Sequence, residues 1–394
     1  MKIAFFSNFL NHHQLPLCME FCKREDVEFT FIATEPISKD RLDMGYADIN
    51  KAYDFVLRAY ENDKSQKNAE ELARNCDVMI FGSAPLLYLE QRMALGKLTF
   101  YFCERILRKG YWRRFIPRTY KKIYKAYLRY KTKPLYVLGA SAYTSYDLKF
   151  CGFDEKKCFK WGYFPETRNR EVKSLLEVKN DKAVEILYAG RLLSLKSVLD
   201  TVKALNLLVQ NDVRNFHFTI IGDGEQKQAI EDYIRTRSLG EYIKILPFIP
   251  AEEVRRHMDK ADVYVFSSNF YEGWGAVVNE AMDSACAMVV SHAVGSAPYL
   301  IRDGENGLIY ESGNIRELAD KLKLLITDQD YRIKLATNAH KTITQEWSPT
   351  MAVERLLKLA NALSADFENN QVFKSGVCSI AEPLKNNWIR HKKK

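Results

Sequence analysis

Short apolar runs alternate with longer amphipathic stretches along most of the chain. The first half contains KIAFFS, VEFTFIAT, DVMIFG, KLTFYFC and PLYVLGA, and the second half contains VEILYAG, FHFTIIGDG, IKILPFI, VYVFSS, AMVVS and GLIYE. Runs of this kind separated by stretches of helical period predict parallel strands joined by crossover helices. The 394 residues are enough for two hydrophobic cores. We therefore expect an α/β protein with two doubly wound, Rossmann-like domains.

The two series of runs are separated by the polar stretch TRNREVKSLLEVKNDKA. This composition predicts an N-terminal domain at 1–165, an interdomain connection at 166–184 and a C-terminal domain at 185–346. The stretch SPTMAVERLLKLANAL predicts a helix, which opens a last segment at 347–394. The tail after this helix ends in RHKKK, and we expect it to be loosely ordered.

Composition excludes several classes of protein. The eight cysteines form no CxxC pair, which argues against a zinc site and a disulfide scaffold and favours a reducing cytoplasm. The N-terminal MKIAFFSNFLNHHQ is expected to be a first strand, because its apolar run is shorter than that of a signal peptide. No window of about 18 uncharged apolar residues predicts a membrane span.

The net charge of +9 comes from one segment. Residues 105–133 hold twelve Lys or Arg and no acid, so the rest of the chain has 47 basic residues (59 minus 12) against 50 acidic ones. Apolar residues at helical spacing predict a helix here that is aromatic on one face and basic on the other. Three interpretations stay open: a solvated surface, an anionic membrane surface or acceptor, and nucleic acid. The absence of acids favours the second, and no nucleic-acid-binding motif supports the third.

Polar residues of the first half gather where strands are expected to end. They are Asn8, Asn11, His12, His13 and Gln14 after the first run, then Ser83, Glu104 and Ser141 after later ones. Because parallel sheets carry their binding loops at the carboxyl ends of strands, we expect these side chains to line a cleft between the domains. A single histidine there is more often a hydrogen-bonded residue at a helix start, and the pattern does not separate His12 from His13. An alternative interpretation of Glu104 is a surface carboxylate that pairs with Arg105.

The second half places two cations and two carboxylates on the corresponding loops. Arg191 and Lys196 lie in AGRLLSLKSVLD, and NFYEGWGAVVNEAM carries Glu272 before a predicted helix and Glu280 on it. Cations and helix N-termini can bind a diphosphate without a metal. Glu272 and Glu280 are separated by at most about 12 Å if the segment is helical, which suits the two ends of a nucleotide-sugar.

The second half resembles the donor domain of the family 4 retaining glycosyltransferases, which have the two-domain GT-B fold. The resemblance is carried in order by AGRLLSLKSV, IIGDGEQKQAIE, YEGWGAVVNEAM and DGENGLIYESGNIRELADKL. It implies two domains facing a central cleft, a C-terminal helix that packs back on the N-terminal domain, and an acceptor-binding role for residues 1–165. It also implies a UDP- or GDP-linked sugar donor, retention of anomeric configuration, and no cofactor or metal.

Residue roles follow from the resemblance. The implied donor-binding residues are Gly190, Arg191, Lys196, Gly222, Phe248, Ile249, Glu272, Gly273, Trp274, Gly275, Ala276 and Glu280. The implied acceptor-side residues are Asn8, Asn11, His12, His13, Ser83 and Glu104, and the candidate catalytic residues are Arg191, Lys196, Glu272, His12, His13 and Glu104. Ser197, Pro247, Ala285, Ala287 and Tyr299 depart from the family pattern, which leaves the base and the sugar open.

The implied acceptor is a saccharide or a polyprenyl-pyrophosphate-linked oligosaccharide of capsule, exopolysaccharide or lipopolysaccharide assembly. The expected location is cytoplasmic, at the inner face of the cytoplasmic membrane if residues 105–133 bind lipid, and no nucleic acid is expected. Two alternatives stay open, an epimerase-like enzyme of the same fold and a non-catalytic partner subunit. A nicotinamide dehydrogenase is disfavoured because no dinucleotide fingerprint follows the first strand. Gly222-x-Gly224 is only a fragment of that fingerprint, since Lys227 occupies the third glycine position. Asp328 and Asp330 are interpreted as a helix cap with an acidic first turn, not as a metal-binding pair.

Overall fold

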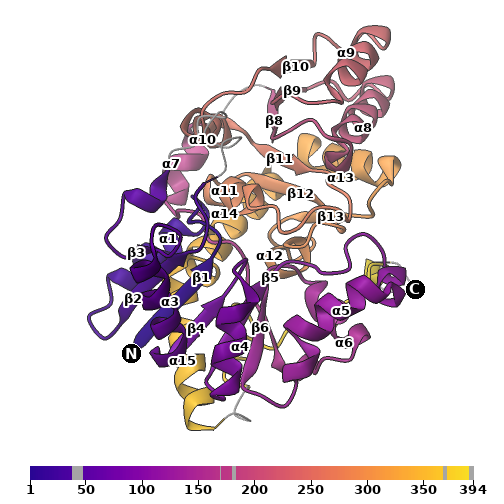
Figure 1. Cartoon of the computed structure of the whole chain (residues 1–394). Coiled ribbons are helices and arrows are strands. Elements are labelled where there is room, and N and C mark those ends of the chain that lie inside the picture. The colour runs from indigo at the N-terminus through magenta and orange to yellow at the C-terminus, as the bar shows by residue number, and fades with distance from the viewer. Residues whose placement is uncertain (38–47, 169, 180–182, 367–370, 390–394) are drawn as a thin grey trace. The chain divides into compact units, whose positions relative to one another are not determined.

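The computed structural model of the chain describes residues 1–37, 48–168, 170–179, 183–366 and 371–389. The chain forms two compact units, each built around its own parallel sheet. Unit 1 contains Met1–Glu166 and Pro349–Leu384, and unit 2 contains Thr167–Ser348 and the chain from Lys385 onward. Figure 1 shows the elements of both units.

The sheet of unit 1 has seven parallel strands in the order β3-β2-β1-β4-β5-β6-β7. Their bounds are β1 (Lys2–Ser7), β2 (Glu28–Ala33), β3 (Val56–Arg58), β4 (Val78–Phe81), β5 (Thr99–Cys103), β6 (Leu135–Gly139) and β7 (Cys158–Lys160). The order reverses next to β1, so β1 and β4 are neighbours although they are far apart in sequence. Ligand sites of doubly wound sheets lie at such a switch point.

The helices of unit 1 are amphipathic and cover this sheet. They are α1 (Leu15–Cys22), α3 (Asp63–Asn75), α4 (Leu86–Ala94), α5 (Pro117–Ala126), α6 (Thr144–Cys151) and α15 (Pro349–Ala365), with shorter turns η1 (Ile49–Lys51), η2 (Tyr111–Phe115), η3 (Leu128–Tyr130) and η4 (Glu155–Lys157). Asn62 caps α3 by accepting a hydrogen bond from the amide of Ser65. Ala69 and Leu89, on α3 and α4, pack against Phe6 and Phe81 of the sheet in one buried cluster.

The sheet of unit 2 has six parallel strands in the order β10-β9-β8-β11-β12-β13. Their bounds are β8 (Val184–Ala189), β9 (Phe216–Ile221), β10 (Ile243–Leu246), β11 (Val263–Phe266), β12 (Ala287–Ser291) and β13 (Leu308–Tyr310). Here the order reverses next to β8, and β11 is its neighbour. The loops after β8, β9 and β11 carry Arg191, Gly222 and Glu272.

The helices of unit 2 include a pair, α8 and α13, that lie side by side. The bounds are α7 (Val172–Glu177), α8 (Val198–Gln210), α9 (Lys227–Thr236), α10 (Ala251–Lys260), α11 (Val277–Asp283), α12 (Ala297–Leu300), α13 (Ile315–Thr327) and α14 (Gln329–Lys341), with η5 (Ser194–Lys196) and the π-helical η6 (Thr342–Glu346). Asp328 caps α14 by accepting from the amide of Tyr331 at 2.9 Å, which confirms the interpretation of this residue as a cap.

The predicted strand pattern agrees with the structure. Each of the eleven apolar runs named above forms a strand, and all the pairings between them are parallel. The sequence pattern missed β3 and β7, which have three residues each and are too short to show a period.

The segment after unit 2 returns to unit 1. The predicted C-terminal helix is α15, and it packs against α1 of unit 1 as expected (Figure 1). The expectation of a loosely ordered tail is wrong for the residues that follow. Val377 and Cys378 are fully buried, and Ile380 pairs antiparallel with Phe159 of β7. The amide of Lys160 donates to the carbonyl of Ser379 at 2.8 Å, so the tail completes the edge of the sheet.

Candidate functional site

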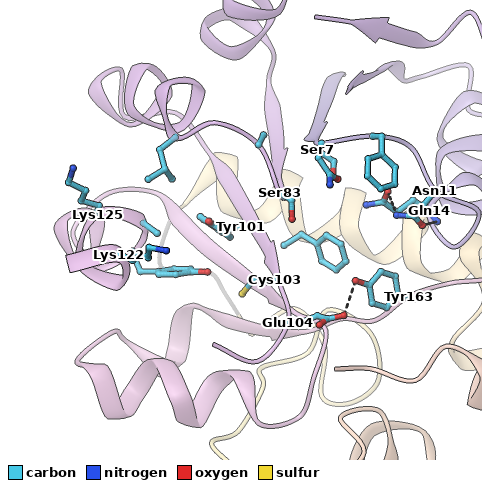
Figure 2. A pocket seen from close by; sticks show the side chains of 18 of the residues that line it. Ser7, Asn11, Gln14, Ser83, Tyr101, Cys103, Glu104, Lys122, Lys125 and Tyr163 are labelled. Atoms are coloured by element: carbon cyan, nitrogen blue, oxygen red, sulfur yellow. Dashed lines mark hydrogen bonds between the residues drawn. The ribbon is translucent and has the colours of Figure 1, made fainter. Parts of the chain in front are cut away.

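Unit 1 contains a cavity of about 810 Å³ at the carboxyl ends of β1, β4 and β5. Its floor includes Ser7 from the end of β1, Ser83 from the loop after β4, and Cys103 and Glu104 from the end of β5. Figure 2 shows these side chains around one space. The prediction that polar strand ends of the first half meet at one edge is thus confirmed for these residues, whereas Ser141 does not line the cavity.

Asn8 and Asn11 both line this cavity, but they are held differently. Asn11 accepts hydrogen bonds from the amides of His13 and Gln14 at 3.0 and 3.2 Å, and its own amide donates to Gln14 Oε1 at 2.7 Å. Asn11 therefore holds the turn before α1. Asn8 accepts from the Ser7 hydroxyl at 3.2 Å, and no described residue accepts from its side-chain amide nitrogen, which can donate to a ligand oxygen.

The two histidines of the first loop occupy different environments. His12 is exposed, while His13 is partly buried and its ring lies 6.0 Å from that of Tyr163. Neither side chain lines the cavity, but Tyr163 does. His13 therefore lies behind a cavity residue, and the structure separates two positions that the sequence did not.

Glu104 lines the cavity next to Tyr163. The Tyr163 hydroxyl donates to Glu104 Oε1 at 3.0 Å, and Arg108 lies 3.6 Å from Oε2. The alternative pairing of Glu104 with Arg105 is wrong, because Arg105 is buried and its guanidinium forms an ion pair with Asp147. Burial raises the pKa of Asp147 to about 6, and Arg105 opposes this shift.

Helix α5 supplies the basic side of the cavity. Arg118, Lys121, Lys122 and Lys125 line it, at positions i, i+3, i+4 and i+7 of one helix face. Figure 2 shows Lys122 and Lys125 at one end of the space and Asn11, Gln14 and Tyr163 at the other. The cavity thus combines a cationic end with a hydrogen-bonding end, at which the Glu104 carboxylate lies beside Tyr163.

The aromatic face predicted for this helix is divided in the structure. Ile123 and Ala126 are buried under the helix, and Tyr127 is buried just after it ends. Tyr120 and Tyr124 instead point to solvent, with 43% and 48% of their surface exposed. The helix therefore has a core face, a cationic cavity face and an exposed tyrosine face, and the prediction of two faces is wrong.

In unit 2, glycines bring two backbone loops together. Gly190 follows β8 and Gly222 follows β9, with φ of 151° and 148°. A Cβ atom on Gly222 would lie 2.0 Å from the carbonyl oxygen of Gly190, and one on Gly224 would lie 2.6 Å from that of Leu192. Only glycine fits at this approach. The contact fixes the loop that carries Arg191 and Lys196 at the carboxyl edge of the sheet.

Lys196 and Glu272 form an ion pair at this edge. The Lys196 ammonium and the Ser268 hydroxyl both donate to Glu272 Oε2, the second at 2.9 Å. The backbone is held as well, because the Ser267 hydroxyl donates to the Lys196 carbonyl at 2.8 Å. Among the described residues, none donates to Glu272 Oε1, so this oxygen is available for a ligand hydroxyl.

The Gly273-Trp274-Gly275 turn is supported by the buried side chain of Trp274. Trp274 is buried, its indole nitrogen donates to Asn279 Oδ1 at 2.9 Å, and its ring lies 5.9 Å from that of Trp347. Gly275 has φ of 83°, and a Cβ there would lie 2.6 Å from the Phe266 ring. Trp274 is thus a structural support for the turn, and its backbone remains the part that a ligand could contact. Ala276 immediately precedes α11.

Glu280 lies on α11 and Glu272 precedes this helix, as the sequence predicted. Burial raises the pKa of Glu280, while the nearby positive charges of Arg255 and Arg168 oppose the shift. Both arginines bond to Asp283 at the end of the same helix, Arg168 Nε at 3.3 Å. In the part of the chain that the structure describes, no group donates a hydrogen bond to the Glu280 carboxylate. This carboxylate can therefore accept from ligand hydroxyls.

The remaining predicted donor residues lie on the loops after β8 and β10. Arg191 is exposed, and no described carboxylate lies within ion-pair distance of it. Phe248, after β10, has 68% of its surface exposed, and Ile249 is partly exposed. An exposed phenylalanine can pack on a flat base.

Sequence reasoning missed two side chains of these sites. Ser268 bonds to Glu272 and lies just after β11, at the strand end 267–275 that the sequence pattern marked, but it was not singled out there as a site residue. Tyr163 follows β7, which was not predicted as a strand, so no signal pointed to it.

Comparison with known proteins gives the family of the second half. Residues 170–342 match the family model described as glycosyl transferases group 1. The GalNAc-α-(1→4)-GalNAc-α-(1→3)-diNAcBac-PP-undecaprenol α-1,4-N-acetyl-D-galactosaminyltransferase of Campylobacter jejuni is 30% identical over 188 residues, which cover 45% of this chain and 51% of that protein. The capsular polysaccharide biosynthesis glycosyltransferase CapM of Staphylococcus aureus is 23% identical over 219 residues, which cover 55% and 56%. The chain spans about half the length of the curated relatives it matches.

Solved structures share the fold over nearly the whole chain. HepE of Anabaena, in complex with UDP, superposes with a TM-score of 0.65 at 16% identity and covers 93% of this chain and 100% of that one. The lipopolysaccharide outer core galactosyltransferase WaaB has a TM-score of 0.57 at 18% identity, covering 87% and 99%. The prediction of two Rossmann-like domains of the GT-B type is therefore confirmed, and the motifs of the second half lie in the segment that matches the glycosyl transferases group 1 model.

Proposed function

Because residues 170–342 are a glycosyl transferases group 1 segment, we propose that this protein is a glycosyltransferase with a nucleotide-sugar donor in unit 2 and an acceptor in unit 1. The acceptor is a saccharide or a lipid-linked oligosaccharide of a cell-surface polysaccharide. The observation that carries the proposal is the arrangement in unit 2 of Arg191, of the Lys196–Glu272 pair and of Glu280 on α11.

Each of these groups suits one part of a UDP- or GDP-linked sugar. Arg191 and Lys196 neutralise the diphosphate, with amides of the glycine loops as further donors. Glu272 Oε1 accepts from hydroxyls of the sugar, and Glu280 accepts from hydroxyls of the ribose. Phe248 and the backbone of Ile249 contact the base. These roles agree with HepE, which was crystallised in complex with UDP-glucose.

The chemistry follows from the position of these charges. As the bond between the sugar and the diphosphate breaks, negative charge grows on the departing phosphate, and Arg191 and Lys196 stabilise it without reorganisation. The departing phosphate takes the proton of the acceptor hydroxyl on the same face of the sugar, so anomeric configuration is retained. No nucleophile of the protein takes part. Transfer therefore needs no metal, and we expect EDTA to leave the rate unchanged.

The surface around α5 suits the inner face of a membrane. Trp112, Phe115, Tyr120 and Tyr124 are exposed there, with 61% and 73% exposure for the first two. Aromatic side chains beside basic ones bind at the headgroup level of anionic bilayers. Among the described residues, no helix is long and apolar enough to cross a bilayer. We propose a peripheral position on the cytoplasmic side.

The function is tested first by binding and then by turnover. UDP-, GDP- and ADP-sugars are added singly to the protein, and the correct donor raises the melting temperature because it binds the folded state. Arg191→Ala and Lys196→Ala are expected to lower kcat by about 100-fold or more, in line with the loss of one preorganised charge. Arg214→Ala is the matched control, since Arg214 precedes β9 at the opposite edge of the sheet. Near-normal turnover in both site variants would reject the proposal.

The products separate the remaining alternatives. An epimerase-like enzyme converts the donor without an acceptor, whereas a transferase releases the nucleotide in proportion to the glycosylated acceptor. A non-catalytic subunit shows the thermal shift without turnover. Proton NMR of the new glycosidic bond reports whether the configuration is retained.

A further inference from the structure

The cationic face of α5 lines the unit 1 cavity, and its four side chains are exposed to solvent. Arg118, Lys121, Lys122 and Lys125 contribute four positive charges to the lining, and Glu104 contributes one negative charge, which leaves a formal balance of +3. Neighbours three or four residues apart on a helix repel when they carry like charge. These four residues form four such pairs, so the helix is electrostatically unfavourable without a counter-charge.

Other basic residues of the same segment already have partners. Arg105 pairs with Asp147, Arg129 with Glu90 and Arg108 with Glu104. Within the described residues, by contrast, no carboxylate forms an ion pair with any of the four cavity cations. Among the described lining residues Glu104 is the one acid, and it is engaged by Arg108 and Tyr163. The described residues therefore supply no carboxylate that pairs with this face.

The opposite end of the cavity has a different chemistry. Ser7, Asn8 and Tyr163 offer neutral hydrogen-bonding groups, and Figure 2 shows Ser7 and Tyr163 away from Lys122 and Lys125. Tyr101 lies between the two ends. A volume of about 810 Å³ is sufficient for a ligand that reaches both, since small-molecule sites commonly measure about 300–1,000 Å³.

We infer that the unit 1 cavity recognises an anionic acceptor, a saccharide esterified to a phosphate or diphosphate, with the phosphate against α5 and the sugar toward Ser7, Asn8 and Tyr163. The identification of the bound ligand as the acceptor rests on the proposed function. The recognition of a phosphate ester by α5 does not. The phosphate ester comes either from a lipid-linked diphosphate or from a soluble sugar phosphate, and the same cations bind both.

The test measures binding of inorganic pyrophosphate to the full-length protein by isothermal titration calorimetry. The background is the double variant Arg191→Ala, Lys196→Ala, which removes the phosphate-binding cations of unit 2. In this background we expect one pyrophosphate site. Lys121→Gln, Lys122→Gln and Lys125→Gln together are expected to weaken it at least tenfold, and the corresponding triple change to Arg is expected to retain it.

A matched control removes the same charge from the same segment. Lys109, Lys131 and Lys133 are basic residues of 105–133 that do not line the cavity, and their triple change to Gln is expected to alter pyrophosphate binding less than twofold. Equal weakening by both triple variants would mean a diffuse charged surface, such as one that binds membranes, and would overturn the inference. Absence of pyrophosphate binding in the background would overturn it as well.

Competition separates the two sources of the phosphate. Farnesyl diphosphate and N-acetylglucosamine 1-phosphate are each titrated against bound pyrophosphate, while methyl N-acetylglucosaminide serves as the uncharged probe. Tighter competition by farnesyl diphosphate assigns a lipid-linked acceptor, and tighter competition by the sugar phosphate assigns a soluble one. Failure of both to compete rejects the site. Because no donor is present, these results do not depend on whether the protein transfers a sugar.

Discussion

Single glycines at the donor loops decide where the charged side chains lie. The loops after β8 and β9 cross at Gly190 and Gly222, where the space that a Cβ would need is taken by a backbone carbonyl. A backbone neighbour cannot rotate away as a side chain can. The Gly-Arg-Leu motif therefore has a structural reason. The glycine allows the two loops to cross, and the crossing fixes the position of Arg191.

Replacing Gly222 by Ala is expected to destabilise unit 2 strongly. The new Cβ would meet the Gly190 carbonyl oxygen at 2.0 Å, and φ of 148° is unfavourable for alanine. Strain and overpacking together give a loss of about 2–5 kcal/mol. The midpoint of urea unfolding, followed by tryptophan fluorescence, measures the effect.

Gly240→Ala is the control for this change. Gly240 has no atom within 4 Å of an added Cβ, so the substitution is expected to change stability by less than about 0.5 kcal/mol. Equal effects of the two substitutions would show that the loop adjusts and that the crossing does not fix Arg191.

At the scale of elements, the sequence predicted those strands and helices that show a clear pattern of apolar residues. Buried parallel strands read as continuous apolar runs, and for that reason strands such as β1 and β8 were identified from the pattern alone. In helix α5 the pattern did not predict which aromatic residues are buried. A tyrosine stripe has the same spacing whether it packs on a core or faces solvent, and the burial of Ile123 but not Tyr124 depends on the position of the sheet.

Ion pairs tie the start of unit 2 to α10. Asp259, on α10, accepts from both guanidinium nitrogens of Arg168 at 3.0 and 2.6 Å and also from Arg170. Burial opposes the charged form, but the hydrogen bonds from Arg170 and Arg168 outweigh it and lower the pKa of Asp259. Arg168 and Arg170 therefore belong structurally to unit 2, although the composition of the sequence around them resembles a linker.

We expect Asp259→Asn to destabilise unit 2 in a pH-dependent manner. A lowered folded-state pKa gives stability that is fully present above the unfolded pKa of about 3.9 and is lost as pH falls toward the folded value. The variant should therefore unfold at lower urea than the wild type at pH 7 and pH 5, and the difference should shrink at pH 3. Asp232→Asn, which removes an exposed pair with Arg235, should have little effect at any pH. A difference for Asp259→Asn that stays constant from pH 7 to pH 3 would contradict this account.

At the scale of the whole molecule, the chain passes between the units three times. It enters unit 2 at Thr167, returns to unit 1 at Pro349 and enters unit 2 again at Lys385. The first two passages follow polar or helical signals that can be read in the sequence. The third could not be predicted, because the pairing of Ile380 with β7 and the contacts of Trp388 depend on surfaces that only the folded units provide.

The docking of residues 385–389 on unit 2 is expected to weaken in acid. His292 Nδ1 accepts from the amide of Ser312 at 2.9 Å, and Nε2 donates to the carbonyl of Asn386 at 3.0 Å. The two bonds require the neutral ring, because a protonated Nδ1 cannot accept. Burial lowers the pKa of His292, while the Asn386 carbonyl and the carboxylates of Glu311 and Glu317 oppose the shift.

The sign of the effect follows from this lowered pKa. The bonds contribute stability that is present above the unfolded pKa of about 6.5 and is lost as pH falls from that value to the folded one, by at most about tenfold in the docking equilibrium for each pH unit in this range. Hydrogen exchange, corrected for the intrinsic rate, should therefore show residues 385–389 protected at pH 7.5 and less protected at pH 5. Residues 377–381 serve as the internal control, since their bonds run to the backbone of β7 and should keep their protection.

Because the His292 ring also lies 5.2 Å from that of Phe270, in the loop that leads to Glu272, the exchange of residues 269–272 should rise together with that of the tail. A tail that loses protection while this loop does not would show that His292 holds only the tail.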